Sequence, residues 1–460
     1  MRGYKAGTIA LTAGLPLLLV LLVGCDDPLT LPFTQVERPD YNNPVDPESR
    51  VLISEILSLV PDTNFRNVIQ QAAERQGAIY NTELQDLWVD LSALSVASID
   101  GIQYLPELTS FGIGPGGGLV FDFSPLAGHT RLEWFNAHEF DVTSIRTVPE
   151  IPTLRAFRIP GTLGVFTLDD IKSTRITELD VSSSTGFSTV SGIGKFSRLR
   201  WLDLRGSSVP ASELSTELTK VAATLEELRI GPISNFSFLG SYPSLVFFGV
   251  EINGTLFGTI MTEISSYGPF RGLGFYGVTS FDALSNLSGS GISELELHFS
   301  GTPTLTGTQL SLLALRRLNV YGASTFTLMS DLPTTIENLE IRSTLLSDTE
   351  VAGIASTLFN LRRLDLSDDD PGTTPNPSYS TLLPLSTNAG TMQNLEEVIV
   401  RNVPLDSSGT VNGIPELAVL PNLRLLDVTR DESVFGPWDT TTSGINDLIN
   451  ATNEQVSVEY

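Results

Sequence analysis

A six-residue pattern recurs along most of the chain and limits the folds open to it. The pattern is L-x-x-L-x-L, with Leu replaced in places by Ile, Val, Phe and once by Ala. Fourteen copies follow one another at intervals of 20 to 34 residues. They begin at Leu108, Leu132, Leu154, Ile176, Leu199, Leu225, Leu245, Phe270, Ile292, Leu315, Ile336, Leu361, Leu395 and Leu423. One such hexamer is uninformative, but fourteen at this spacing indicate a repeat protein.

Each copy predicts one short strand whose alternate apolar residues face inward. A single unit cannot bury that face, whereas stacked units join their strands into one parallel sheet over one core. The predicted fold is therefore an α/β repeat solenoid, a horseshoe with a parallel concave sheet. Residues 212–223 and 348–358 have helical spacing, so we expect a partly helical convex side. The other return segments are rich in Gly, Ser and Thr, and no regular Asn follows the strands, which predicts an irregular horseshoe.

Residues 60 to 430 resemble a leucine-rich-repeat protein. Two segments, P-D-T-N-F-R-N-V-I (61–69) and S-I-D-G-I-Q-Y-L-P-E-L (98–108), are similar to the helical cap and first repeat of bacterial internalins. The resemblance implies a small helical cap over the first strand, which would otherwise be an exposed sheet edge. Asp62 or Thr63 would begin its helix, which would end near Gln76.

The N-terminus predicts export. Arg2 and Lys5 precede an apolar run that ends in L-V-G-C, and Cys25 is the only cysteine of the chain. This ending resembles the lipobox of bacterial lipoproteins, which implies cleavage between Gly24 and Cys25 and acylation of the Cys25 thiol. The alternative is an ordinary signal peptide in which the cysteine is incidental. The lipobox interpretation predicts a lipoprotein anchored to a membrane of the bacterial cell envelope, either periplasmic or surface-exposed.

These features predict the domain organisation. We expect a lipoprotein signal peptide at 1–24, an acidic, Pro-rich tether at 25–48, an N-terminal cap with a capping repeat at 49–107, about fourteen leucine-rich repeats at 108–429 and a C-terminal cap at 430–460. The repeats would carry an insertion at 367–394, predicted to be a long loop on one rim. V-S-V-E-Y at the end of the chain would be a final edge strand.

Composition excludes several function classes. Asp and Glu total 53 against 27 Lys and Arg, a net charge of −26, which excludes a nucleic-acid-binding protein. One cysteine excludes an intramolecular disulfide and any Cys-based metal site. No phosphate loop, G-x-S-x-G or H-E-x-x-H motif occurs with the flanking strand or helix that such a motif requires. We therefore expect no enzyme, cofactor or resident metal. Asp368–Asp370 could bind calcium, but a solvated acidic turn is the favoured interpretation.

The sheet geometry selects candidate partner-binding residues. The third and fifth residues of each hexamer, and the residue after it, should point out of the concave face. In four consecutive repeats this places Tyr276, His298, Tyr321 and Arg342 in one stripe, hereafter the concave stripe. The equivalent columns add Arg317, Arg363, Trp134, Trp201 and Phe247. Exposed Tyr, Trp and Arg dominate interface hot spots, although exposed strand positions favour aromatic residues in any case.

The predicted function is binding of a protein partner through the concave face by a monomeric surface adhesin or envelope scaffold. The alternative is glycan binding, with aromatic rings stacked on sugars beside carboxylates. A third and weaker possibility is an enzyme that uses His298 near Glu294 and Glu296. Replacement of Tyr276 and Tyr321 by alanine is expected to weaken capture and to leave the thermal midpoint nearly unchanged.

Overall fold

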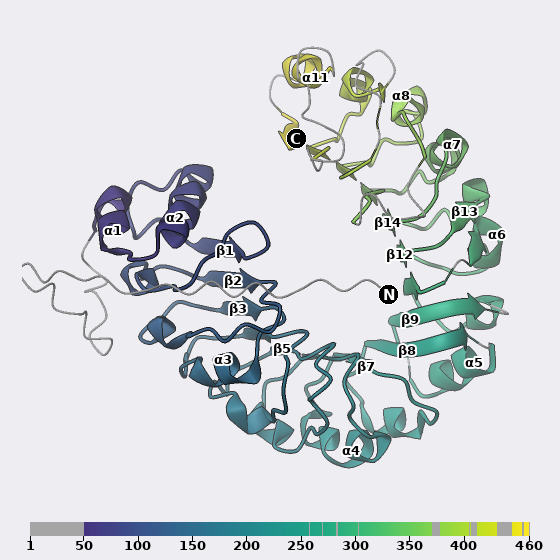
Figure 1. Ribbon diagram of the computed structural model, residues 1–460. Helices are drawn as coiled ribbons and strands as arrows, with labels where there is room; N and C mark the ends of the chain where they lie inside the picture. The colour runs from purple at the N-terminus through teal and green to yellow at the C-terminus, as the bar shows by residue number, and fades with distance from the viewer. Residues whose placement is uncertain are drawn as a thin grey trace, which may run out of the picture. The chain divides into compact units, whose positions relative to one another are not determined.

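The computed structural model describes residues 50–256, 258–268, 270–281, 284–301, 303–369, 378–403, 405, 412–429, 444–452 and 455–459. Figure 1 draws these residues in colour. The signal peptide, the tether, Gly24 and Cys25 lie outside the described residues, as do residues 430–443 of the tail.

In the part of the chain that the structure describes, sixteen strands form one parallel sheet in chain order. The strands are β1 (Asp86–Asp90), β2 (Ser110–Gly114), β3 (Trp134–Ala137), β4 (Ala156–Arg158), β5 (Glu178–Asp180), β6 (Trp201–Leu204), β7 (Glu227–Ile230), β8 (Phe247–Leu256), β9 (Gly272–Phe281), β10 (Glu294–Phe299), β12 (Arg317–Tyr321), β14 (Asn338–Arg342), β15 (Arg363–Asp365), β16 (Glu397–Ile399), β17 (Leu425–Asp427) and β18 (Ser457–Glu459). The predicted leucine-rich-repeat solenoid is confirmed, because each of the fourteen hexamers supplies one strand.

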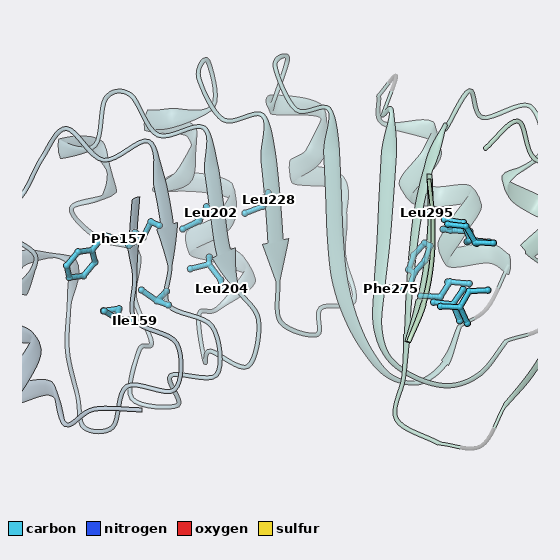
Figure 2. Close-up of a cluster of buried hydrophobic side chains, with 14 of the residues drawn as sticks. Phe157, Ile159, Leu202, Leu204, Leu228, Phe275 and Leu295 are labelled. Carbon is cyan, nitrogen blue, oxygen red and sulfur yellow. The ribbon is translucent and has the colours of Figure 1, made fainter. Parts of the chain in front are cut away.

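Equivalent residues of neighbouring repeats lie side by side. Leu295 pairs with Leu318, and Leu318 pairs with Leu339, so each apolar column continues from strand to strand. The inward side chains are buried in one continuous hydrophobic core that runs from the cap to the last repeats. Phe157, Leu202, Leu228, Phe275 and Leu295 in Figure 2 belong to it. The strands line the inner side of a curved row, and the helices of the return segments lie on its outer side (Figure 1).

Two helices, α1 (Ile53–Leu59) and α2 (Thr63–Gln76), precede the first strand. One carboxylate oxygen of Asp62 accepts a hydrogen bond from the Phe65 amide at 2.9 Å, so Asp62 is the N-cap of α2. At the other end, the Gln76 side chain donates to the Asp86 carbonyl at 2.6 Å and ties α2 to β1. The predicted helix from Thr63 to Gln76 is thereby confirmed.

The return segments are helical only in part. The helices are α3 (Val142–Thr147), α4 (Ala211–Thr216), α5 (Gly258–Ser266), α6 (Gly307–Leu310), α7 (Asp348–Thr357), α8 (Leu383–Thr387) and α11 (Ile445–Ala451). The predicted helix at 348–358 is α7, whose capping box joins Ser347 and Glu350. The segment at 212–223 is α4 followed by a 3-10 turn. Two short strands that the sequence did not predict, β11 (Thr304–Thr306) and β13 (Thr325–Thr327), pair in a second sheet. No helix among the described residues is long and apolar enough to span a membrane.

The insertion at 367–394 was predicted to be a long loop on one rim. This prediction is wrong for its second half, which is packed into the core. Tyr379, Leu382, Leu385 and Met392 are fully buried, and the Tyr379 hydroxyl donates to the Leu366 carbonyl at 2.8 Å. This part therefore serves as the return segment of its repeat, because its apolar side chains complete the core beneath β15.

The prediction of a solvated acidic turn is wrong for Asp368, whereas Asp369 is exposed. Asp368 is only 1 % exposed and accepts a hydrogen bond from the Ser343 hydroxyl at 3.1 Å. Asp369 lies 3.7 Å from Arg342, and Asp370 is outside the described residues. Among the residues that are described, no group of three or more His, Cys, Asp or Glu side chains is placed to hold a metal ion.

Polar side chains directly before several hexamers join neighbouring repeats. Each bonds to a backbone carbonyl of the preceding repeat at 2.6 to 2.9 Å. We call this set the rim ladder; it consists of Thr153, Ser244, Thr335, Asn360, Asn394 and Asn422. These hydrogen bonds join adjacent repeats in place of the regular Asn that is missing after the strands. They help to keep neighbouring repeats in register in an irregular solenoid.

Close backbone stacking of the return segments predicts the effect of a small substitution. A Cβ at Gly186 would lie 2.0 Å from the Gly164 carbonyl oxygen of the preceding repeat. Gly186→Ala should lower the free energy of unfolding by about 1–3 kcal/mol because two backbones must separate. Gly390→Ala is the control, since nothing lies within 4 Å of its Cβ position. Equal denaturation midpoints for the two variants would contradict the stacking.

Candidate binding face

The concave stripe is continuous, as the sequence predicted. His298 is in register with Tyr321, and Tyr321 with Arg342. The ring centroids of Tyr276 and His298 are 4.8 Å apart, and those of His298 and Tyr321 are 5.5 Å apart in a stacked arrangement. Parallel strands in register place these side chains in contact, because residues at equivalent positions repeat at the strand spacing.

Two of the predicted contact residues are buried instead of exposed. Tyr276 is 4 % exposed and Phe247 is 6 % exposed. The cause is the row of glycines at neighbouring concave positions. A Cβ at Gly274 would lie 2.7 Å from the Tyr276 hydroxyl oxygen, and one at Gly272 would lie 2.4 Å from the Phe247 ring. Both rings therefore lie flat on the sheet, and the glycines in L-V-F-F-G-V and F-R-G-L-G-F are the signal that could have predicted it.

Tyr276 belongs to a buried cluster that also contains Arg229, Glu296 and Glu227. Arg229 donates from Nε to the Tyr276 hydroxyl oxygen at 2.7 Å and from Nη2 to both Glu296 carboxylate oxygens at 3.1 and 3.2 Å. The Tyr276 hydroxyl in turn donates to Glu296, and Arg229 also pairs with Glu227. These residues come from β7, β9 and β10, so the cluster crosses the sheet and fixes the concave surface beneath the stripe.

Burial and charge fix the protonation states in this cluster. Burial opposes ionisation of Glu296, but the Arg229 guanidinium prevails and lowers the pKa of Glu296. Burial and the Glu296 charge raise the pKa of Tyr276, so its hydroxyl remains a donor. Burial lowers the pKa of His298 to about 4 against the pull of Glu296, which makes the imidazole neutral at pH 7. The stripe therefore presents neutral rings over a fixed ion-pair network.

Buried aspartates recur at the fifth hexamer position. Their burial was not predicted from the sequence. Asp203, Asp365 and Asp427 are at most 1 % exposed. In each, one carboxylate oxygen accepts from the amide two residues later at 3.0 to 3.2 Å. The other accepts from a guanidinium, that of Arg205, Arg342 or Arg401, at 2.5 to 2.6 Å. Such pairs keep a buried charge compensated. Arg342 is therefore held by Asp365 and is not free at the end of the stripe.

The other candidates differ in how accessible they are. Arg363 pairs with Glu397 at 2.6 Å, and the Trp201 indole donates to Glu227 at 2.6 Å. Tyr321 is partly exposed, and Trp134 is 41 % exposed. Arg317 is exposed, and its guanidinium forms no hydrogen bond or ion pair with the described residues. The accessible members of the predicted set are thus Trp134, His298, Tyr321 and Arg317.

A residue outside the hexamers adds a second feature near the cap. Trp88 on β1 is 45 % exposed and, with Trp134, lines a pocket of about 170 Å³, hereafter the tryptophan cleft. The Trp88 ring lies over Gly112, where a Cβ would come within 2.0 Å of it. The buried Asn136 amide oxygen in this lining has no hydrogen-bond partner among the described residues. Trp88 was missed because it precedes the first recognised hexamer.

We compared the sequence and the fold with those of known proteins. No protein-family model and no curated protein match the sequence. An internalin (inlF) from Listeria monocytogenes is similar in structure, with 18 % identity and a TM-score of 0.39, over 75 % of this chain and 96 % of that chain. A leucine-rich-repeat protein from Leptospira interrogans has 14 % identity and a TM-score of 0.35, over 82 % and 90 %. Internalin C2 from Listeria monocytogenes has 16 % identity and a TM-score of 0.30, over 54 % and 98 %. The repeat architecture itself follows from the strand register described above.

The buried cluster changes what loss of a tyrosine should do. Tyr276→Phe removes the hydroxyl that joins Arg229 to Glu296, so we expect a loss of about 1–3 kcal/mol in the free energy of unfolding. Tyr321→Phe is the matched control, since its hydroxyl has no hydrogen bond to described residues. Chemical denaturation measures both. The thermal midpoint of a Tyr276→Ala variant should therefore fall, contrary to the sequence-based expectation, and equal stability of the two Phe variants would contradict the cluster.

Proposed function

We propose that this protein binds a protein partner through its concave face. The observation that carries the proposal is the partly exposed His298–Tyr321 ring stack at the ends of β10 and β12, together with the exposed Arg317 at the start of β12 on the same face. Tyr and Arg are enriched in hot spots because each combines a large contact area with a hydrogen-bonding end. Fourteen repeats are long enough to present such a group to a folded partner.

The buried cluster supports this proposal by making the surface rigid. Arg229 is only 14 % exposed and holds side chains from three strands. Side chains that are already ordered lose little conformational entropy on binding, so more of the interaction energy appears as affinity. The lowered pKa of His298 also keeps the ring stack uncharged at physiological pH.

The sequence also supports a location for this activity. L-V-G-C at the end of the N-terminal apolar run favours a lipid-anchored lipoprotein of the bacterial envelope, acylated at Cys25. The acidic, Pro-rich segment 25–48 would then hold the repeats away from the membrane surface. The chain would act as a surface adhesin or as an envelope scaffold.

Removal of the exposed group tests the binding proposal. The double variant Arg317→Ala with Tyr321→Ala should bind a partner recovered from envelope extract about tenfold or more weakly, because two hot-spot side chains are lost. The control is Leu312→Ala with Arg316→Ala, both exposed and outside the concave columns. Binding is measured by surface plasmon resonance, and thermal midpoints verify folding. The same affinity in both double variants would rule out this group as the contact.

The tryptophan cleft favours a second function, which is recognition of a glycan. Trp88 and Trp134 offer aromatic surface for sugar stacking, and the unsatisfied Asn136 oxygen offers an acceptor for a sugar hydroxyl. If this function is correct, a glycan array should give a signal that Trp88→Ala abolishes and that Arg317→Ala leaves unchanged. An array without signal, beside a captured protein, would leave protein binding as the function.

Lipid anchoring has its own test. In a bacterial host, the wild-type chain should incorporate an alkynyl fatty acid and partition with membranes. Cys25→Ser should lose both properties because no thiol remains to be acylated. Label retained in the Cys25→Ser variant would contradict acylation at this residue, and an unlabelled wild-type chain would favour an ordinary signal peptide.

A further inference from the structure

A pocket of about 600 Å³ lies where strands β3 to β8 begin, on the rim of the sheet and outside the concave stripe. We call it the rim pocket. Its lining includes four arginines, Arg155, Arg175, Arg198 and Arg200. The lining also includes four glutamates, so its formal charge is 4 − 4 = 0, against −26 for the chain as a whole.

The carboxylates of the lining are already paired. Glu226 lies 2.7 Å from Arg200, Glu178 lies 2.9 Å from Arg158, and Glu133 lies 3.7 Å from Arg155. Glu227 pairs with Arg229 in the buried cluster. Within the described residues, therefore, no lining carboxylate is left to neutralise Arg175 or Arg198.

Arg175 and Arg198 occupy unusual places in the repeat. Each stands directly before a hexamer, at the position where Thr153 and other members of the rim ladder bond to the preceding repeat. Both arginines are exposed, and neither forms a hydrogen bond or ion pair with described residues. Their repeats are adjacent, so the two guanidinium groups extend from positions about one strand spacing, roughly 4.8 Å, apart. An anion between them would relieve their repulsion.

We propose that the rim pocket binds an acidic, extended polypeptide segment, with carboxylates of the segment paired to Arg175 and Arg198. The lining crosses six strands, or roughly 24 Å, which is the length of about seven extended residues. Pro152 and the half-exposed Val246 supply apolar contacts near β4 and β8. The guanidinium groups of Arg158 and Arg229 lie 5.2 and 5.6 Å from the Trp201 ring centroid. Because these groups already contact the ring, it is not available to stack on a sugar, and a peptide ligand is favoured.

The rim pocket is independent of the proposed contact on the concave face. Its ligand is attracted by Arg175 and Arg198, because at about 0.15 M salt the Debye length of about 8 Å screens distant carboxylates of the chain. An acidic segment could therefore bind here whether or not a partner occupies the concave stripe.

Fluorescence anisotropy with a labelled synthetic peptide of alternating Glu and Val tests the proposal on the full chain at about 0.15 M salt. Arg175→Gln with Arg198→Gln should weaken binding by roughly tenfold or more, since two charge-assisted contacts are lost. Arg316→Gln with Arg362→Gln is the control. It removes the same charge from the same rim, where Arg316 faces Glu337 and Arg362 pairs with Glu396. Its affinity should stay within about twofold of the wild type.

Three results would overturn the proposal. They are an undetectable affinity of the wild-type chain, equal weakening in both double variants, and Arg175-dependent binding of an acidic oligosaccharide in place of the peptide. The single variants Arg175→Gln and Arg198→Gln serve as a second measurement, and each should give a partial loss. Thermal midpoints of all variants should match the wild type, because the altered side chains are exposed.

Discussion

Parallel pairing between neighbouring repeats is the interaction on which the rest of this structure depends. Each strand is three to ten residues long and carries an apolar side that only the next repeat can cover. The register places leucine against leucine along the sheet, as in Leu295, Leu318 and Leu339, and the rim ladder joins neighbouring backbones. The cap helix α2, tied through Gln76 to β1, covers the edge at which the sheet would otherwise begin unprotected.

The same register creates the concave face and decides which of its side chains are accessible. Three glycines in two neighbouring repeats let Tyr276 and Phe247 lie flat and allow Arg229 to reach Glu296 across the sheet. His298, Tyr321 and Arg317 lie on β10 and β12 and take no part in the hydrogen bonds of this cluster. Under the proposed function, stability and recognition are carried by different residues, so binding can be altered without unfolding the chain.

The sequence predicted the fold more fully than the site. Hexamer spacing located each repeat strand, and the helix beginning at Asp62 or Thr63 and the helix at 348–358 followed from local patterns. Burial on the concave face was harder to predict because it depends on neighbours in space. Tyr276 at the end of its hexamer looks exposed until the glycines of the adjoining strands are considered. Asp203, Asp365 and Asp427 look like surface acids until their arginine partners are known. Trp88 lies outside the pattern that defined the candidates.

Site-specific photo-crosslinking in intact cells tests the central claim, that the concave face is the binding surface, most directly. A photoreactive amino acid in place of Tyr321 should give one defined adduct with a second protein. The same amino acid in place of Phe359, which is 50 % exposed and follows α7 by two residues, should give none. Adducts of equal yield at both positions, or an adduct only at Phe359, would contradict recognition through the concave face.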